Sequence, residues 1–375
     1  MTLTIKEIST KKGLLEFIKF PDKLYSQSKF YIPPIHSKEL QNFSFKKNPA
    51  LEFCTAKYWL VLKDKEIVGR VAGIINKKYN KKHNINYARF GWLDFIDDYE
   101  VLKLLLQTVE KWAISENMEI IHGPVGFTSF DASGVLIEGF NEIPTSFAHY
   151  NFPYYSKLIE KSGYEKDVDW VEFCVKMPKE VPDKIIKGSK IVQKRYNLHQ
   201  LEIKKSKDYI GYLDEFFSIL NESYKDLYAF TELTEKQVDN LKKKFFSLIN
   251  PDYISIILDN EDKLIAFGVA IPSMSKALKE SKGKLFPFGY YRIWRALHKN
   301  DIADLLLLAV KPDYQNKGVP AIIFEKIGQT FLNNKIKYLE TTRELENNNK
   351  IKQLWTNYEF RQHKKARCYI KKLKK

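Results

Sequence analysis

The chain has 375 residues, of which 44% are hydrophobic and 14% aromatic, so it can form a large apolar core and is long enough for two domains. This composition excludes collagen-like and disordered chains. The longest apolar runs, such as 305–310, are far too short to span a bilayer. The first residues show no charged segment followed by an apolar one, so we expect no signal peptide and a cytoplasmic protein. The three cysteines are far apart in sequence and fit neither a zinc site nor a disulfide framework, so we expect no metal.

The net charge is +16, and nearly all of the positive residues are lysines. Two interpretations stay open: a lysine-biased composition spread over solvated faces, or attraction to an anionic partner. That partner is either the phosphates of CoA, a negatively charged membrane surface or RNA. Base-specific recognition of nucleic acid prefers clusters of arginine, so nucleic acid is the least expected of the three. The oligomeric state is left open.

The first half of the chain alternates predicted strands and helices. Residues 2–8 alternate apolar and charged side chains, which predicts a strand, and a helix follows. Two apolar runs flanking a polar turn at 63–66 predict a β-hairpin. The remaining predictions for this half are strands at 57–62, 67–75, 88–95, 119–124 and 170–177, and helices at about 98–117 and 154–159.

The second half repeats this order after a lysine-rich segment at 178–199, which we expect to be a linker with some helix. An aromatic and basic insertion at 274–299 interrupts it. The predicted elements are strands at 201–204, 253–258, 264–271, 305–310 and 336–341, helices at about 213–227, 238–249, 320–333 and 349–356, and a final strand. The repetition predicts two copies of one α/β domain, over 1–177 and 200–375.

One segment of the second half points to a ligand. The apolar run Leu305–Val310 is followed by a polar turn with one glycine, Gly318, and then by an amphipathic helix. The run is continuous, so we expect a strand buried on both faces. A strand–turn–helix of this kind leaves N–H groups without partners at the helix start, where the helix dipole is positive. The segment therefore predicts a site for a phosphate-bearing ligand.

This order of elements and this turn resemble the GNAT superfamily, the Gcn5-related N-acetyltransferases, whose motif is Gln/Arg-x-x-Gly-x-Gly/Ala. Gln315 and Gly318 match the motif, whereas Pro320 departs from it. The resemblance implies an α/β protein of two tandem GNAT-like domains, each a mixed, mostly antiparallel twisted sheet flanked by helices. It implies acetyl-CoA or a longer acyl-CoA as co-substrate, with a backbone N–H of the strand near 308–310 polarising the thioester carbonyl. The residues that it assigns to the CoA site are Leu308, Ala309, Val310, Gln315, Asn316, Lys317, Gly318, Val319 and Pro320.

A second pattern of the family concerns proton transfer. Asn348, Leu354-Trp355 and Glu359-Phe360 occupy its spacings, and Trp355 replaces the tyrosine that in this family often protonates the departing thiolate. Tyr358 is one substitute, and an acid is dispensable if the thiol, with a pKa of about 8.5, leaves unaided. The candidates for the base are Glu340 and Glu344, acting through water, and also Asp304. Each of these carboxylates also fits an ordinary surface role, and Asn348 also fits a helix cap.

The first half resembles the same fold more weakly, at Tyr154-Tyr155 and Gly163-Tyr164. In place of the glycine turn it has Asp97-Asp98-Tyr99-Glu100. Carboxylates at a helix start satisfy the dipole and repel phosphate. We therefore predict that this half binds no CoA, packs on the second half and shapes the acceptor site.

The expected function is an acyl-CoA-dependent N-acyltransferase that acts on an amine. Segments such as Gly69-Arg70-Val71, Gly123-Pro124 and Glu344-Leu345-Glu346-Asn347 also resemble tandem GNAT-like bacterial proteins, some of which are thought to N-acylate long-chain amines in sphingolipid synthesis. Two alternatives remain: an aminoacyl-tRNA-dependent tandem-GNAT ligase and a non-catalytic CoA-binding module. The insertion aromatics fit an acyl-chain channel, a membrane surface at the inner face, or plain core; they are Phe286, Phe288, Tyr290, Tyr291 and Trp294.

Overall fold

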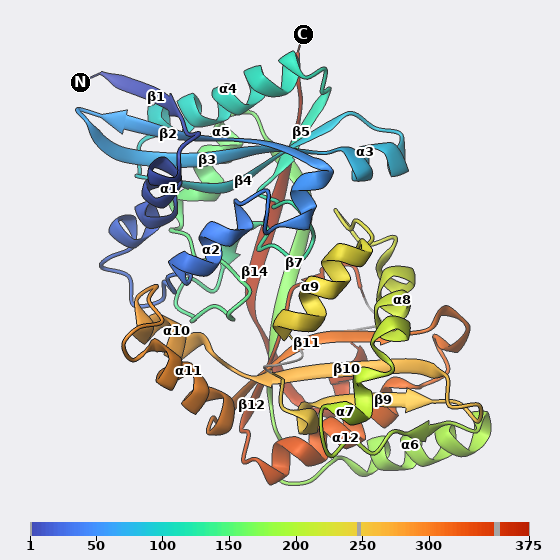
Figure 1. Ribbon diagram of the computed structural model, residues 1–375. Helices are drawn as coiled ribbons and strands as arrows, with labels where there is room; N and C mark the ends of the chain where they lie inside the picture. Colours follow the sequence, from blue (N-terminus) through green and yellow to red (C-terminus); the bar gives the residue numbers. More distant parts are fainter. Residues whose placement is uncertain (1, 246–248, 349–352, 375) are drawn as a thin grey trace. The chain divides into compact units, whose positions relative to one another are not determined.

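The computed structural model of the protein describes residues 2–245, 249–348 and 353–374, which form two compact units (Figure 1). The first unit contains residues 1–171, 275–292 and 363–375, and the second contains 172–274 and 293–362. Strands β7 (Glu165–Lys176) and β14 (Glu359–Lys372) and helix α11 (Gly289–His298) contribute residues to both units. The end of the chain therefore returns to the first unit, where Tyr369–Lys372 of β14 pair with β5 (Ile120–Gly123).

The first unit is built on a mixed sheet with the strand order β1-β2-β3-β4-β5-β14. Only β4 and β5 pair in parallel; the other neighbours are antiparallel. Asp64 and Lys65 both have positive φ, as the tight turn between β2 and β3 requires, which confirms the predicted hairpin. The elements are β1 (Leu3–Glu7), α1 (Lys11–Leu24), α2 (His36–Asn42), β2 (Cys54–Lys63), β3 (Glu66–Asn76), α3 (Lys77–His83), β4 (Tyr87–Phe95), α4 (Tyr99–Ser115), β6 (Val135–Glu138), α5 (Tyr154–Lys161) and α10 (Ser275–Ser281).

Helices cover both faces of this sheet. A Cβ on Gly69 of β3 would lie 2.8 Å from Leu105 of α4, so the strand and this helix are in close contact. The next residue, Arg70, points to the opposite face, where its guanidinium lies 4.9 Å from the ring centre of Phe17 in α1. Glycine at position 69 thus allows α4 to pack directly on the sheet.

The second unit has the strand order β7-β12-β11-β10-β9-β8, and β13 also pairs with β7. Here β11 and β12 are the parallel pair. The elements are α6 (Asp183–Tyr196), β8 (His199–Gln200), α7 (Lys207–Ile210), α8 (Leu213–Tyr224), α9 (Glu235–Phe245), β9 (Ile254–Leu258), β10 (Leu264–Pro272), β11 (Ile302–Val310), α12 (Pro320–Asn333), β12 (Tyr338–Thr341) and β13 (Glu344–Leu345), with a 3₁₀ turn at Trp355–Asn357.

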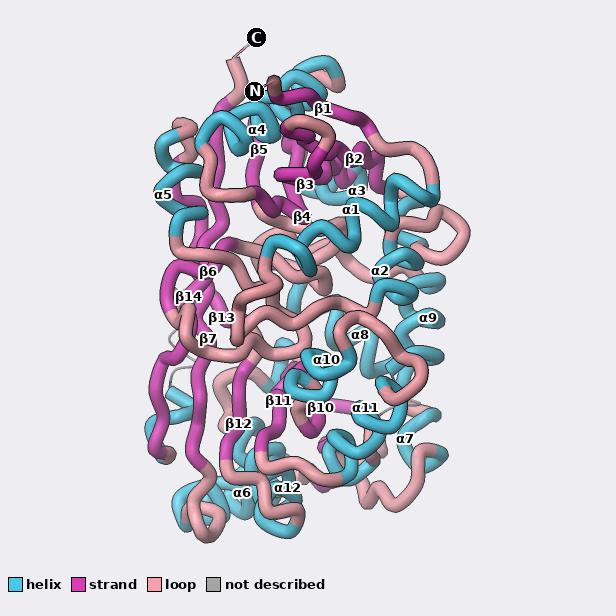
Figure 2. The backbone as a smooth tube through the Cα atoms, turned by 90° about the vertical axis from the view of Figure 1, so that its left-hand side faces the viewer, coloured by secondary structure: helices cyan, strands magenta, loops and turns pink. Residues whose placement is uncertain are grey.

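Two neighbouring residues of β10 define the faces of this second sheet. Phe267 stacks on Phe216 of α8 with ring centres 3.6 Å apart. A Cβ on the next residue, Gly268, would lie 2.4 Å from Ile323 of α12. Helices α8 and α12 therefore cover opposite faces, and α6 packs beside α12 (Figure 2).

Most predicted elements are present, and one predicted strand is not. The strand predicted at 201–204 is wrong, because the residues that pair with β9 are His199–Gln200. The segment 178–199 contains the 14-residue helix α6, whose apolar side packs on α12. The helix predicted at 349–356 lies partly outside the described residues, as does the end of the one predicted at 238–249. The predicted boundaries of two domains stay a prediction.

Within the described ranges, no helix combines the length and the apolar character needed to cross a bilayer.

Candidate functional site

An open strand edge lies at the centre of the second sheet. Strands β11 and β12 pair only from Ile302 with Tyr338 to Leu305 with Thr341. Strand β12 ends there, whereas β11 continues to Val310, so its edge loses the neighbouring strand. The pairing of β11 with β10 shifts register between Val269 and Ala270, which places one extra residue, Leu306, in a β-bulge. The two parallel strands therefore separate beside a bulge.

The open edge corrects one prediction. The apolar run 305–310 was expected to be buried on both faces, but Leu306, Leu307 and Leu308 are only half-buried. The reason is that their neighbouring strand has ended. Leu307 packs against the core beneath α8, whereas Leu306 and Leu308 keep part of their surface exposed.

Backbone groups of Leu308 point to this open edge. Lys311 donates to the Ile265 carbonyl at 2.8 Å, and pairing alternates along an antiparallel ladder, so Leu308 lies in a pair that exchanges no hydrogen bonds with β10. Its carbonyl instead accepts from the Tyr224 hydroxyl at 3.1 Å. The Leu308 N–H therefore points to the space that β12 leaves open, as an oxyanion donor would.

The turn before α12 presents a group of backbone donors. Asn316 and Gly318 both have positive φ, and in the described part of the chain the N–H groups of residues 316–319 donate no backbone hydrogen bond. Val319 begins α12 without a side-chain cap, and the first turn of the helix holds no acidic residue. Pro320 is at the first helical position, where its missing N–H has no intrahelical partner to lose. This arrangement is suited to an anion.

Side chains hold this turn and make it basic. The Gln315 side-chain amide donates to the Val310 carbonyl at 3.2 Å, so Gln315 fastens the turn to the end of β11. Lys317 lies 5.2 Å from the ring centre of Tyr196 and 4.8 Å from that of Tyr314. Tyr196 ends α6, whose last turn also carries Lys194 and Arg195. The sequence predicted a linker with some helix here, and its lysines at helical spacing are part of α6.

The corresponding turn of the first unit carries carboxylates at the start of its helix. Asp98 caps α4 by accepting from the Glu100 N–H at 3.0 Å, and Glu100 adds a second carboxylate to the first helical turn. Lys63 contacts Asp98 at 3.2 Å. The helix dipole is thus satisfied by the chain itself.

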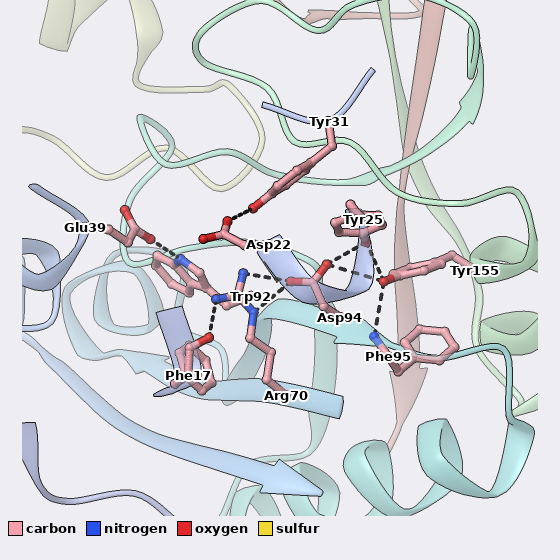
Figure 3. Close-up of polar contacts among 10 residues, drawn as sticks. All are labelled: Phe17, Asp22, Tyr25, Tyr31, Glu39, Arg70, Trp92, Asp94, Phe95 and Tyr155. Atoms are coloured by element: carbon pink, nitrogen blue, oxygen red, sulfur yellow. Dashed lines mark hydrogen bonds and ion pairs between the residues drawn. The ribbon is translucent and has the colours of Figure 1, made fainter. Parts of the chain in front are cut away.

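The corresponding strand edge of the first unit is also filled, as Figure 3 shows. Phe95 lies opposite Gly69 of β3 as Leu308 lies opposite Gly268 of β10. Its N–H donates to the Tyr155 hydroxyl at 3.2 Å, and its carbonyl accepts from the Tyr154 hydroxyl at 2.5 Å. The donor that is open in the second unit is therefore occupied by a tyrosine in the first.

A buried network keeps Tyr155 in place (Figure 3). Its hydroxyl lies 2.6 Å from that of Tyr25, which donates to Asp94 at 2.7 Å. Arg70 donates to the other oxygen of Asp94 through Nε at 2.8 Å, and its Nη2 is 2.7 Å away. Burial, with the Asp94 charge next to it, raises the pKa of both tyrosines, so they stay protonated and hydrogen-bonded.

The predicted bases lie at different distances from the open edge. Glu340 lies opposite Asp304 in the paired part of the sheet, and Asp304 is buried and accepts from Ser273 at 3.3 Å. Asp304 precedes Leu308 by four residues, or about 13 Å of strand. Glu344 follows β12 in β13 and is half-buried. Of the two predicted glutamates, Glu344 is therefore the one placed after the point where the strands separate.

The electrostatics of Tyr224 connect Glu344 with the open edge. Burial raises the pKa of Tyr224 to about 12, and the Glu344 carboxylate adds to that rise. The charge of Glu344 therefore acts on the hydroxyl that contacts the Leu308 carbonyl. Of the predicted bases, it is the one that the structure connects with the open edge.

The candidates for the acid have weaker support. Burial raises the pKa of Tyr358 to about 12, so transfer of its proton to a thiolate of pKa about 8.5 is uphill by about 5 kcal/mol. Trp355 is buried against Phe324 of α12, with ring centres 5.3 Å apart, and so acts in packing. Asn348 is half-buried and donates its N–H to Leu345 at 2.9 Å; the residues that follow it lie outside the described ranges.

Sequence reasoning missed a buried ion pair next to Glu344. Arg343 donates through Nε to Glu172 at 3.2 Å, and both side chains are largely buried. The two Nη atoms of Arg343 are buried and have no hydrogen-bond partner in the described structure.

The first unit also contains a hollow of about 370 Å³ beside Asn80 and Asn84. None of the predicted site residues line it.

Two curated relatives match most of the chain. Protein YghO of Escherichia coli is 26% identical over 376 residues, covering 98% of this chain and 95% of the relative. A protein named bacterial ceramide synthase, of Caulobacter vibrioides, is 24% identical over 327 residues, covering 84% of this chain and 82% of the relative. No family model matches the sequence.

Solved structures resemble the whole chain at low sequence identity. A tandem GNAT protein from the clavulanic acid biosynthesis pathway aligns with a TM-score of 0.57 and 10% identity, covering 100% of this chain and 99% of that one. A GCN5-related N-acetyltransferase of Sphaerobacter thermophilus aligns with a TM-score of 0.52 and 8% identity, covering 100% and 96%. The predicted fold class is confirmed: the chain has the tandem GNAT fold.

Proposed function

We propose that this protein is an acyl-CoA-dependent N-acyltransferase whose reaction takes place in the second unit. The observation that carries the proposal is the contrast between the units. The second unit has an open edge on β11 and an uncapped α12, whereas in the first unit tyrosines and carboxylates fill both positions. An acyl-CoA has a thioester carbonyl at one end and phosphates at the other. The Leu308 N–H on β11 suits the carbonyl, and the N–H groups of the following turn suit the phosphates.

In this proposal the turn before α12, the Leu308 N–H and the leucine side chains of β11 each bind a different part of the ligand. The N–H groups of 316–319 bind CoA phosphate, helped by the dipole of α12 and by Lys317. The Leu308 N–H donates to the thioester carbonyl oxygen and stabilises the negative charge that grows there as the amine attacks. The half-buried Leu306 and Leu308 contact the apolar part of the ligand.

Proton transfer is assigned to Glu344. An amine with a pKa of about 10 is mostly protonated near neutrality and must lose a proton before it attacks. Glu344 accepts that proton through water; the amine nitrogen then bonds to the carbonyl carbon, gives up its second proton to water, and the C–S bond breaks to leave a neutral amide. CoA leaves as a thiolate and takes its proton from solvent, so the step needs no strong acid at Tyr358.

The acceptor in this proposal is a long-chain amine. The support is the relative named bacterial ceramide synthase, together with the leucines at the open edge. Such an amine is held in a membrane, so the proposal includes peripheral contact with an anionic bilayer. A non-catalytic CoA-binding role is the second candidate, because Trp355 is used in packing where the family has its tyrosine.

The test is release of CoA thiol by the purified chain from acetyl-CoA or palmitoyl-CoA, with and without sphinganine or a short amine. Release that depends on sphinganine supports the proposal, and Gly318→Glu should strongly reduce it at limiting acyl-CoA. Binding of CoA without release on any amine would favour the non-catalytic role. Release only with an aminoacyl-tRNA as donor would favour the tRNA-dependent ligase.

A further inference from the structure

An exposed aromatic surface lies on the loop and helix that follow α10, drawn in orange in Figure 1. We call it the aromatic surface and define it as Lys282, Lys284, Phe286, Phe288, Tyr290 and Tyr291. These six residues belong to the first unit. Phe286 is 76% exposed and Tyr291 60%, and the other two rings are more than half exposed. The suggestion that these aromatics are plain core is therefore wrong.

The rings point outward in a regular pattern. In α11 the exposed positions are 290, 291, 294, 295 and 298, which form one stripe of the helix. The opposite positions, Ile293, Ala296 and Leu297, are half-buried. The helix therefore has aliphatic residues on its inner side, and its solvent-facing side also carries aromatic rings. Four rings of this size leave roughly 500 Å² of apolar area exposed, an extent that marks interaction sites.

The protein holds this loop in position. His36 donates its N–H to the Gly283 carbonyl at 3.1 Å, and the Lys279 ammonium contacts the Lys29 carbonyl. Gly289 has no room for a side chain, because a Cβ there would lie 2.2 Å from the Lys284 carbonyl. Arg292 donates to the Glu280 carbonyl at 3.0 Å. The rings are thus displayed by an ordered loop.

The charge of the segment selects the kind of partner. Residues 281–300 contain five lysines and arginines and no aspartate or glutamate. Lysine is depleted at the centre of protein–protein interfaces, whereas aromatic rings beside lysines suit the headgroup zone of an anionic bilayer. We infer that the aromatic surface docks the protein on a membrane that contains anionic lipid. This inference deepens the proposed function, which includes contact with an anionic bilayer, by assigning that contact to a defined surface, and it rests on separate observations.

The test is cosedimentation of the full chain with vesicles of phosphatidylcholine, alone or mixed with phosphatidylglycerol. Binding is expected to the mixed vesicles and to weaken with salt. A lysine near an anionic surface strengthens binding about fivefold, so Lys282→Gln with Lys284→Gln should weaken it roughly 30-fold. Phe286→Ser, Phe288→Ser and Tyr291→Ser together should weaken it at least tenfold.

Matched controls change the same chemistry elsewhere. Phe45→Ser with Phe130→Ser removes exposed rings, and Lys204→Gln with Lys205→Gln removes exposed charge; both should bind as the wild type. Thermal midpoints check that every variant folds. No binding to mixed vesicles, or equal binding by the ring variants, would overturn the inference. So would a change from dimer to monomer in the ring variants without vesicle binding, which would indicate a second copy as the occupant.

The vesicle assay uses neither CoA nor amine. A negative result there would remove the proposed membrane contact but leave the acyl-transfer step intact, and a failure of acyl transfer leaves the membrane inference intact.

Discussion

Gly318→Glu is the substitution that addresses the proposed CoA site most specifically. Gly318 has a φ of +78°, and a Cβ there meets only Val192, at 3.2 Å. The new side chain therefore fits, at a cost of about 1–2 kcal/mol for a residue with a Cβ in the left-handed region. Its carboxylate is expected to compete with the phosphate for the N–H groups of 316–319.

The expected loss of affinity follows from the charge. Two like charges about 4 Å apart repel by about 1 kcal/mol in water and about 4 kcal/mol near a protein surface. An intermediate value of about 2.7 kcal/mol raises the dissociation constant about 100-fold. At 100 times its dissociation constant, the ligand stabilises the wild type by about 2.7 kcal/mol; at the same concentration the variant gains about 0.4 kcal/mol.

Thermal-shift titration with free CoA, acetyl-CoA and palmitoyl-CoA measures this difference. For a unit of this size the wild-type shift is about 5–11 °C and the variant shift about 1 °C. Gly318→Ala has the same backbone strain without the charge and should keep most of the shift. Gly211→Glu adds the same charge where a Cβ has no neighbour within 4 Å and should also keep it. A full shift in Gly318→Glu would refute the assignment of this turn to phosphate.

Three further predictions concern the base, the closed first unit and acid stability. Glu344→Gln should lower kcat about 10²- to 10⁴-fold with little change in the KM for acyl-CoA, and steady-state kinetics in which Glu340→Gln has the larger effect would transfer the role to Glu340. Tyr155→Phe should lower the free energy of unfolding in urea by about 1–3 kcal/mol, because buried partners lose a hydrogen bond. It should create no CoA-dependent thermal shift in a Gly318→Glu background, because Asp98 still caps α4. Burial acts to raise the pKa of Asp169, but hydrogen bonds from Arg367 and two lysines outweigh it and lower the pKa to about 2. The unfolded value is higher, so this carboxylate stabilises the fold above about pH 4 and loses that effect as the pH falls towards 2. Asp169→Asn should reduce the midpoint temperature at pH 7 more than at pH 2.5, and equal reductions would contradict the argument.

Local patterns predicted the elements because their causes are local. Asp64 and Lys65 form a turn between two apolar runs, and the helical spacing of apolar residues at 98–117 matches α4. Side-chain period and turn chemistry depend on neighbours in sequence. The hairpins, the main helices and the glycine turn were therefore accessible without a structure.

Features that depend on distant partners were not accessible. Nothing local in 363–375 indicates that this strand pairs with β5 of the first unit. The hydrogen bond from the Phe95 N–H to Tyr155 joins residues 60 positions apart. Pairing between residues so far apart in sequence depends on how the whole chain folds.

Apolar patterns also allowed more than one interpretation. A continuous run such as 305–310 looks the same whether a strand is buried on both faces or partly faces a ligand. The aromatic residues of 286–291 equally fit a core or a surface. In both cases burial, which the sequence does not contain, decides between the alternatives.

The most direct test of the central claim is the mass of the product formed from palmitoyl-CoA with a deuterium-labelled acyl chain, sphinganine and the purified protein. At a palmitoyl-CoA concentration near the wild-type dissociation constant, the account predicts an N-acylated sphinganine that carries the full label, formed by the wild type and by Gly211→Glu and in at least tenfold lower yield by Gly318→Glu. Free labelled palmitate without the amide, or the same amide yield from Gly318→Glu, would contradict it.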